Sequence, residues 1–394
     1  MNAESIKDLS GQMVTVVDPG SPTPRSARIL QTGAHWSLQE LTEDQGQGPS
    51  PVDRDLHISP GWVDLHTHVY DGMTQISVHP DRVGIDQGVH LLADAGSAGA
   101  ATISGLAKYV VPSVRTKVVA WINVGSHGLV HLREVADPTF IDVDATIAAV
   151  EAHRNLIRGI KVRSSGAIVG AMGIQPLQLA KFVARATETP LMVHIGEAPP
   201  IVEDILDMLG QGDVVTHCFH GKAGKPWDNT GRPVPALLRA LDRGVILDVG
   251  HGAASFDIEV ARTATTLGIW PTTISTDIHV RNIDGPVFSL AAVMTKLLQC
   301  GMPLHEVITA TTTAPRRVLK ALEPWLDEDK RIRHATIFRV TPAPPGGWQH
   351  LDSAGPQPTP VSQLVAEATI SHDGLRPCTG TSSSSPLHRR TCPT

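Results

Sequence analysis

Short apolar runs alternate with longer amphipathic stretches from Pro60 to about residue 312. The starts of these runs lie 23 to 42 residues apart, which suits strand–turn–helix units of about 30 residues. Eight runs are predicted to be strands: 61–66, 89–94, 117–124, 159–163, 191–195, 214–218, 245–249 and 272–276. Strands that are apolar almost throughout are buried on both faces, as in a parallel sheet. The pattern therefore predicts an α/β fold, a (β/α)8 TIM barrel, with an open doubly wound sheet as the alternative.

The two flanks of this region follow another pattern. Residues 1–58 hold short apolar pieces between stretches rich in Pro, Gly and Gln, and residues 323–374 hold further strand-like pieces. We expect these flanks to pair in one small β domain beside a barrel of residues 59–322. Residues 375–394, which include four consecutive serines, are expected to be disordered.

Composition narrows the classes of function. Apolar residues make up 41% of the 394, and a net charge of −6 with 4% aromatics argues against a nucleic-acid partner. No apolar run approaches the ~20 residues that cross a bilayer, and no signal peptide is recognisable. The four cysteines show no spacing typical of disulfides or zinc clips, so we expect a cytoplasmic protein with no membrane partner. Histidine is unusually frequent, with 19 copies, and it is the commonest metal ligand among the side chains.

Polar side chains stand at the carboxyl ends of the predicted strands. His66 and His68 are two residues apart, so a strand would project both rings from one face. Other strand ends carry Lys161, His194, His217 and Asp277. Since the carboxyl ends of barrel strands meet at one mouth, we expect these side chains to converge there.

The residue types at this mouth indicate a metal site. Imidazole and carboxylate ligands suit zinc, with manganese, iron or nickel as alternatives. Lys161 needs an explanation, because an ammonium group cannot bind a cation and is costly inside an apolar strand. Reaction with CO2 would convert it into a carbamate, whose oxygens could bridge two divalent metal ions about 3.5–4 Å apart. The sequence thus predicts two divalent ions, with zinc expected, and a CO2-derived carbamate on Lys161.

At these residues the sequence resembles the amidohydrolase superfamily, in its subtype with two metal ions, over roughly residues 60–319. Further segments resemble one subgroup, the amidohydrolase/deacetylase metallohydrolases that are grouped with dihydroorotases. These segments are DAGSAGA (94–100), INVGSHGL (122–129), HCFHGKAG (217–224), DVGHGAASF (248–256) and STDIH (275–279). The resemblance implies that the flanks form a small β-sandwich and that the substrates are small acylated compounds: amides, cyclic imides or esters.

The resemblance also implies a role for each site residue. His66, His68 and Asp277 would hold the more buried metal, His194 and His217 would hold the more exposed one, and carboxylated Lys161 and a hydroxide would bridge them. In this hypothesis the metal-bridging hydroxide attacks the substrate carbonyl, and Asp277 acts first as general base and then as general acid.

Four further residues at the same end of the barrel are candidates for substrate binding. Arg163 follows Lys161 by two residues and so shares its face, where it could bind a substrate carboxylate or form a salt bridge in the mouth. Asn123 ends a predicted strand, and His220 and His251 follow two others. Each of these three could contact substrate or hold a turn in place.

The leading function is a metal-dependent amidohydrolase or deacetylase. Its substrate would be small and anionic, of the N-acetyl amino acid or O-acetyl hydroxy acid type. A cyclic amidohydrolase such as a dihydroorotase is the alternative among enzymes. From another class, a catalytically silent barrel could serve as an assembly partner, although all six ligand positions are present. Assembly into a homo-oligomer is left open.

Overall fold

A parallel sheet wound into a barrel forms the larger part of the protein. The computed structural model describes residues 9–41, 55–343, 350–352, 355–357 and 362–379. Seven strands are hydrogen-bonded in chain order and run parallel. They are β5 (Trp62–Thr67), β6 (Val89–Gly99), β7 (Lys117–Asn123), β8 (Ile157–Ser164), β9 (Leu191–Ile195), β10 (Val214–Thr216) and β11 (Ile246–Asp248). Each overlaps a run predicted from the sequence, which confirms the predicted (β/α)8 barrel class.

The eighth predicted strand, residues 272–276, closes the barrel through isolated bridges and scattered backbone hydrogen bonds and not through a regular ladder. On one side, Asp248 and Thr273 form a parallel bridge. On the other side, the amide of Asp277 donates to the carbonyl of His66 at 2.7 Å. The closing segment therefore brings Asp277 directly beside the end of β5.

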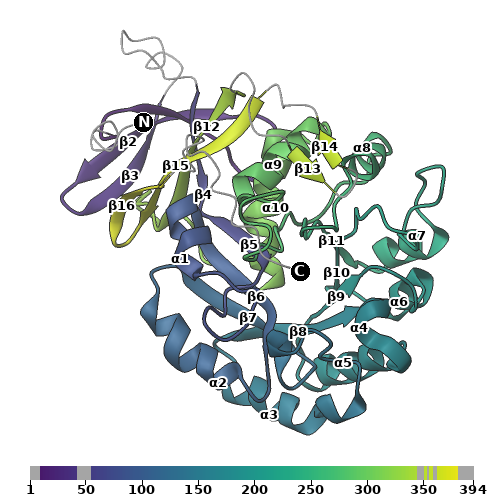
Figure 1. The fold of residues 1–394 in the computed structure, drawn as a ribbon. Coiled ribbons are helices and arrows are strands. Elements are labelled where there is room, and N and C mark those ends of the chain that lie inside the picture. The colour runs from purple at the N-terminus through teal and green to yellow at the C-terminus, as the bar shows by residue number, and fades with distance from the viewer. Residues whose placement is uncertain (1–8, 42–54, 344–349, 353–354, 358–361, 380–394) are drawn as a thin grey trace.

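Helices cover the outside of the barrel (Figure 1). They are α1 (Pro80–Val83), α2 (Ile103–Gly105), α3 (Val143–Ala152), α4 (Gly166–Val169), α5 (Gln175–Ala186), α6 (Val202–Met208), α7 (Pro235–Asp242), α8 (Ile258–Thr266), α9 (Leu290–Gln299), α10 (Leu304–Thr311) and α11 (Thr313–Val318). Helix α5 shows the physical pattern: Leu177, Ala180 and Val183 are buried at helical spacing, while Lys181 on another side of the helix is partly exposed.

The two flanks form one small β domain, as predicted. Its seven strands make a continuous sheet in the order β16-β15-β12-β4-β1-β2-β3. They are β1 (Met13–Val16), β2 (Arg25–Thr32), β3 (His35–Glu40), β4 (Leu56–Pro60), β12 (His334–Pro342), β15 (Ser362–Ser371) and β16 (Gly374–Pro377). A separate hairpin joins β13 (His350–Asp352) to β14 (Gly355–Gln357).

Strands from opposite ends of the chain lie side by side in this sheet. Strand β4 pairs in parallel with β1 on one side and antiparallel with β12 on the other. In Figure 1, purple N-terminal strands accordingly lie next to yellow-green C-terminal ones. Strand β16 continues to Pro377, so the predicted disordered tail, 375–394, begins inside a strand, and residues 380–394 lie outside the described residues.

A buried pair of histidines joins the small domain to the barrel. His90 of β6 is in contact with the carbonyl of Ala335 through Nε2, at 2.9 Å, and its ring lies 6.1 Å from that of His334. Gly61 is the residue between β4 and β5, and a Cβ atom there would lie only 2.6 Å from the His90 ring. Glycine at this position therefore lets the two domains pack closely.

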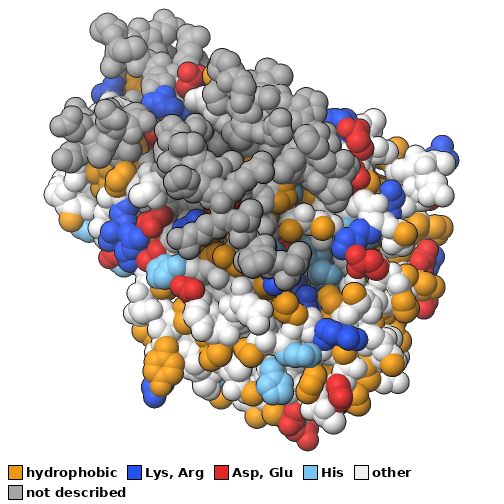
Figure 2. Space-filling model, viewed as in Figure 1, with side chains coloured by type: hydrophobic (Ala, Val, Ile, Leu, Met, Phe, Trp, Pro, Cys, Tyr) orange, Lys and Arg blue, Asp and Glu red, His pale blue; other side chains and the backbone are white. Residues whose placement is uncertain are grey.

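The surface of the described residues shows mixed charge on the face seen in Figure 2, where Lys and Arg side chains are interspersed with Asp and Glu. In the described part of the chain, no single helix is long and apolar enough to cross a membrane. One bent pair, residues 166–172 with 175–186, meets that length and hydropathy test only jointly.

Candidate metal centre

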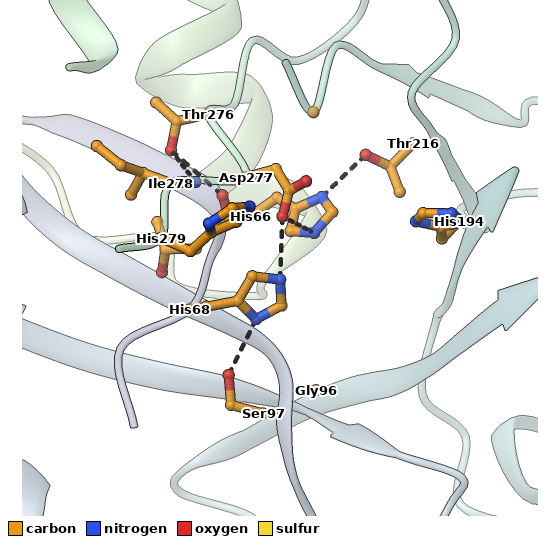
Figure 3. Close-up of polar contacts among 12 residues, drawn as sticks. His66, His68, Gly96, Ser97, His194, Thr216, Thr276, Asp277, Ile278 and His279 are labelled. Atoms are coloured by element: carbon orange, nitrogen blue, oxygen red, sulfur yellow. Dashed lines mark hydrogen bonds and ion pairs between the residues drawn. The ribbon is translucent and has the colours of Figure 1, made fainter. Parts of the chain in front are cut away.

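His66 and His68 emerge from the end of β5 and face Asp277 of the closing segment. The Nε2 atom of His68 lies 3.0 Å from Asp277 Oδ1, and Nε2 of His66 lies 3.3 Å from the same oxygen. Figure 3 shows the two rings and the carboxylate turned toward one another. The strand alternation predicted from the sequence therefore holds at this strand end.

His194 and His217 meet on the other side of His66. Nε2 of His217 lies 2.8 Å from Nδ1 of His194, and the rings of His66 and His217 are 5.2 Å apart. His217 has a φ of 69° and Asp277 has a φ of 50°. Residues other than glycine rarely adopt such positive φ angles. Backbone strain at these two positions is typical of functional sites.

Lys161 extends from the middle of β8 into this cluster. Its Nζ atom lies 3.1 Å from His66 Nε2 and 3.3 Å from Met192 Sδ, and the residue is 1% exposed. It makes no ion pair with any described residue. Burial lowers the pKa of Lys161 to about 7. Lys161 is therefore not buried as one partner of a structural salt bridge, and another role must account for its burial.

The six predicted ligands thus form one connected cluster. Ligand atoms of His66, His217 and Asp277 lie within 4.8 Å of one another, and the other three residues adjoin them. Tetrahedral ligands around zinc lie about 3.3 Å apart, close to the 3.0–3.3 Å separations found here. Both the spacing and the donor types therefore fit divalent metal ions.

Burial governs the protonation of these groups. Burial lowers the pKa of His217 to about 3 and holds that of His194 well below its ordinary value. Burial alone would raise the pKa of Asp277, but the adjacent rings of His66 and His68 hold it well below the usual range. His194 and His217 therefore offer neutral imidazoles and Asp277 offers an ionised carboxylate, which are the forms that bind metal.

Arg163 is committed to a buried carboxylate. Its Nε and Nη2 atoms donate to the two oxygens of Glu134 at 2.7 and 2.5 Å, and Glu134 is 1% exposed. Asn123 is also held in place, since its amide donates to the carbonyl of Gly96 and accepts from the amide of Gly125. These contacts show the structural alternative for both residues, and their predicted contact with substrate stays a prediction.

The two remaining candidates differ from each other. Both ring nitrogens of His251 have partners: Nδ1 lies 2.8 Å from the carbonyl of Gly252 and Nε2 lies 2.7 Å from Nζ of Lys296. In His220, Nδ1 accepts from the amide of Lys222, which leaves the hydrogen on Nε2. That buried nitrogen has no hydrogen-bond partner among the described residues. His220 is therefore the better placed of the two to donate to substrate.

Several contributing residues escaped the sequence prediction. Ser97 Oγ lies 2.9 Å from His68 Nδ1, and Thr216 Oγ1 lies 3.0 Å from His66 Nδ1 (Figure 3). Ser97 lies within the DAGSAGA segment and belongs to β6, which continues beyond the predicted strand end at residue 94. Lys296 carried a detectable signal, because it is a lone lysine in an apolar helix, as Lys161 is in an apolar strand.

Three curated proteins that are similar to this chain in sequence are all named deacetylases. A deacetylase of Brucella anthropi is 42% identical over 290 residues, which are 73% of this chain and 72% of that protein. A deacetylase of Agrobacterium fabrum is 41% identical over 290 residues, 73% of this chain and 71% of its own. A deacetylase of Enterococcus faecalis is 38% identical over 287 residues, with coverages of 72% and 78%.

Two solved structures resemble the whole fold. A dihydroorotase superposes with a TM-score of 0.81 at 34% identity and covers 93% of this chain and 98% of its own. An adenine deaminase superposes with a TM-score of 0.82 at 29% identity, with coverages of 93% and 100%. No protein-family model matches the chain.

Proposed function

The chain belongs to the amidohydrolase superfamily, in the family of the deacetylases just described, and from this premise we propose its substrate and the roles of its residues. It is a metal-dependent hydrolase. We propose that it removes the acyl group from a small anionic compound, such as an N-acetyl amino acid or an O-acetyl hydroxy acid. The observation that carries this proposal is the convergence of the predicted ligands around a buried lysine that forms no ion pair with any described residue.

The proposed cofactors are two zinc ions, held by the residues of the cluster. His66, His68 and Asp277 would form one part of the site, and His194 and His217 the other, with carboxylated Lys161 between them. Bound divalent ions would supply an activated water and an electrophile for the acyl carbonyl. Imidazole and carboxylate donors support zinc.

Asp277 is the proposed proton carrier. Its Oδ1 is occupied by two histidine rings, whereas Oδ2 faces Gly252. A Cβ atom on Gly252 would lie only 2.7 Å from Oδ2, so the missing side chain leaves room at that oxygen. Oδ2 would take a proton from the attacking water and return it to the leaving nitrogen or oxygen.

The position of Lys222 is an argument for an anionic substrate. It forms a 2.8 Å ion pair with Glu197, whose other oxygen accepts from Ser165 at 2.5 Å. The preceding residue, Gly196, adjoins the ring of His194. Lys222 therefore lies on the rim beside the His194 side of the cluster, and its side chain is 26% exposed. In this proposal it takes the place that the sequence assigned to Arg163.

The function is tested by hydrolysis assays on the zinc-loaded protein. We expect acetate release from N-acetyl amino acids or O-acetyl hydroxy acids, and loss of activity after chelation that zinc restores. Asp277→Asn should lower kcat by about 10²–10⁴ while metal content is retained, and Asp137→Asn, an exposed loop change, should not. Near-normal kcat in Asp277→Asn contradicts its assigned role.

The same assays separate the alternatives. Turnover of dihydroorotate or hydantoins without acetate release would favour a cyclic amidohydrolase, the activity named for one structural neighbour. Less than one metal ion per chain and no turnover of any compound would favour the silent barrel. For the anionic substrate, Lys222→Met should raise KM for charged substrates and leave neutral acetyl esters unaffected.

A further inference from the structure

A chain of buried hydroxyl groups lies behind the His66 ring, on the side away from the ligand cluster. Thr216 Oγ1 lies 3.0 Å from His66 Nδ1 and donates to Asp248 Oδ2 at 2.7 Å. Ser275 donates to the same carboxylate oxygen at 2.6 Å, and Thr273 donates to the other at 2.7 Å. All five residues are buried. They join β5, β10, β11 and the closing segment in one network.

The single hydroxyl proton of Thr216 determines where the proton of His66 resides. A threonine has one hydrogen to donate, and the Asp248 carboxylate is the acceptor of three hydroxyl groups, at 2.6 to 2.7 Å. The Thr216 proton therefore points to Asp248, and its oxygen presents lone pairs to the ring. Nδ1 of His66 must then carry the N–H. On the opposite side, Nε2 faces both Lys161 Nζ at 3.1 Å and Asp277 Oδ1 at 3.3 Å, so the contact with Thr216 is the one that decides the tautomer.

We propose that Thr216, anchored by Asp248, is a positioning residue that fixes His66 as the Nδ1–H tautomer before any metal binds. This inference rests on the metal centre of the proposed function. It adds that a contact with Thr216 sets the tautomer of one ligand in advance. A metal ion binds the lone pair of a neutral imidazole, so a preset ring needs neither rotation nor a proton shift.

The neighbouring ligands have matching partners. Nδ1 of His68 faces the hydroxyl of Ser97 at 2.9 Å, and Nδ1 of His217 faces the carbonyl of Gly250 at 2.5 Å. A carbonyl can only accept, so His217 also carries its hydrogen on Nδ1. The contact at His66 Nδ1 is thus one of several Nδ1 contacts that turn the Nε2 atoms of these rings toward a common point.

The first experiment needs no variant. Long-range ¹H–¹⁵N spectra of the metal-free chain, labelled with ¹⁵N-histidine, distinguish the two tautomers, and the spectrum of His66→Gln identifies the signals. We expect His66 to show the Nδ1–H pattern. An Nε2–H pattern would overturn the proposal, whether or not the protein is a hydrolase.

The second experiment measures zinc affinity by competition with a chelator. Thr216→Val removes the hydroxyl at similar volume and should weaken affinity about 10- to 100-fold, while Thr216→Ser should restore it. Thr273→Val is the matched control, because it removes a hydroxyl from the same carboxylate without touching His66. Equal losses in Thr216→Val and Thr273→Val, or no loss in either, would overturn the proposal. If wild type binds no zinc, the proposed function fails, and the tautomer spectrum alone decides this inference.

Discussion

Lys161 is the residue whose environment is hardest to reconcile with an ordinary lysine. Its amine is surrounded by an imidazole and a thioether, and the residue is 1% exposed. A neutral amine can react with CO2 to form a carbamate and release one proton. The product would be a second anionic ligand in the cluster, beside the carboxylate of Asp277.

Isotope labelling tests this carbamate. With zinc and ¹³C-bicarbonate, wild type should show a carbamate carbon signal, and Lys161→Met should lose that signal and weaken zinc affinity at least about tenfold. Lys296→Met is the matched control, because Lys296 is equally buried but lies outside the ligand cluster. A signal of full strength in Lys161→Met would assign the carbamate elsewhere.

The convergence of the candidate ligands could be predicted from the sequence because strand geometry restricts their positions. His66 and His68 had to share a face, and the carboxyl ends of barrel strands had to meet. The substrate candidates could not be separated from structural residues in this way. The partner of Arg163 is Glu134, which comes from a loop 29 positions away whose conformation has no sequence periodicity.

At the scale of elements, strand β6 carries an irregularity that shapes the centre. Its pairing with β7 shifts register between Ala95 and Gly99, and Gly96 within the shift has a φ of +85°. This conformation directs Ser97 to His68 and leaves space for the stem of Lys161. The sequence prediction ended the strand at residue 94, because a glycine-rich segment resembles a turn as much as a bulge.

Gly96→Ala is expected to disturb the centre beyond its backbone cost. An added Cβ would lie 2.8 Å from Lys161 Cγ, so the lysine must move and zinc affinity should fall by at least about tenfold. Gly72→Ala is the control: its φ of +77° carries a similar penalty of about 1–2 kcal/mol, but no atom lies within 4 Å of the added carbon. Denaturant unfolding and zinc titration of both variants check this, and equal zinc affinities would contradict it.

At the scale of the whole molecule, the joint between barrel and small domain excludes water from two histidines. Burial lowers the pKa of both His90 and His334 to about 3. The nearby guanidinium of Arg316, whose Nη2 lies 3.3 Å from His334 Nδ1, acts in the same direction. Both rings therefore stay neutral in the folded protein across the pH range in which free histidine becomes charged.

Stability should fall as the pH drops below about 6.5, the pKa of histidine in the unfolded chain. Between pH 6.5 and 3 the unfolded state binds more protons, so each histidine removes up to about 1.4 kcal/mol per pH unit from the free energy of unfolding. Above pH 6.5 each histidine is neutral in both the folded and the unfolded state, so it no longer makes the free energy of unfolding depend on pH. Measured by urea unfolding, the free energy of unfolding of His90→Gln should depend less steeply on pH than that of wild type. His372→Gln, with a side chain 88% exposed, should not change the slope, and an unchanged slope in His90→Gln would refute this account.

The pairing of β4 with β12 has a consequence for synthesis on the ribosome. Strand β4 is synthesised long before β12, because even the nearest partners in sequence, Pro60 and Ala335, are separated by the whole barrel. The edge of β4 that β12 will cover stays open while the barrel strands are translated, and unpaired edges attract other chains. The β4 edge therefore stays unpaired until β12 has been synthesised, and the small domain can complete its sheet only after the barrel strands have been made.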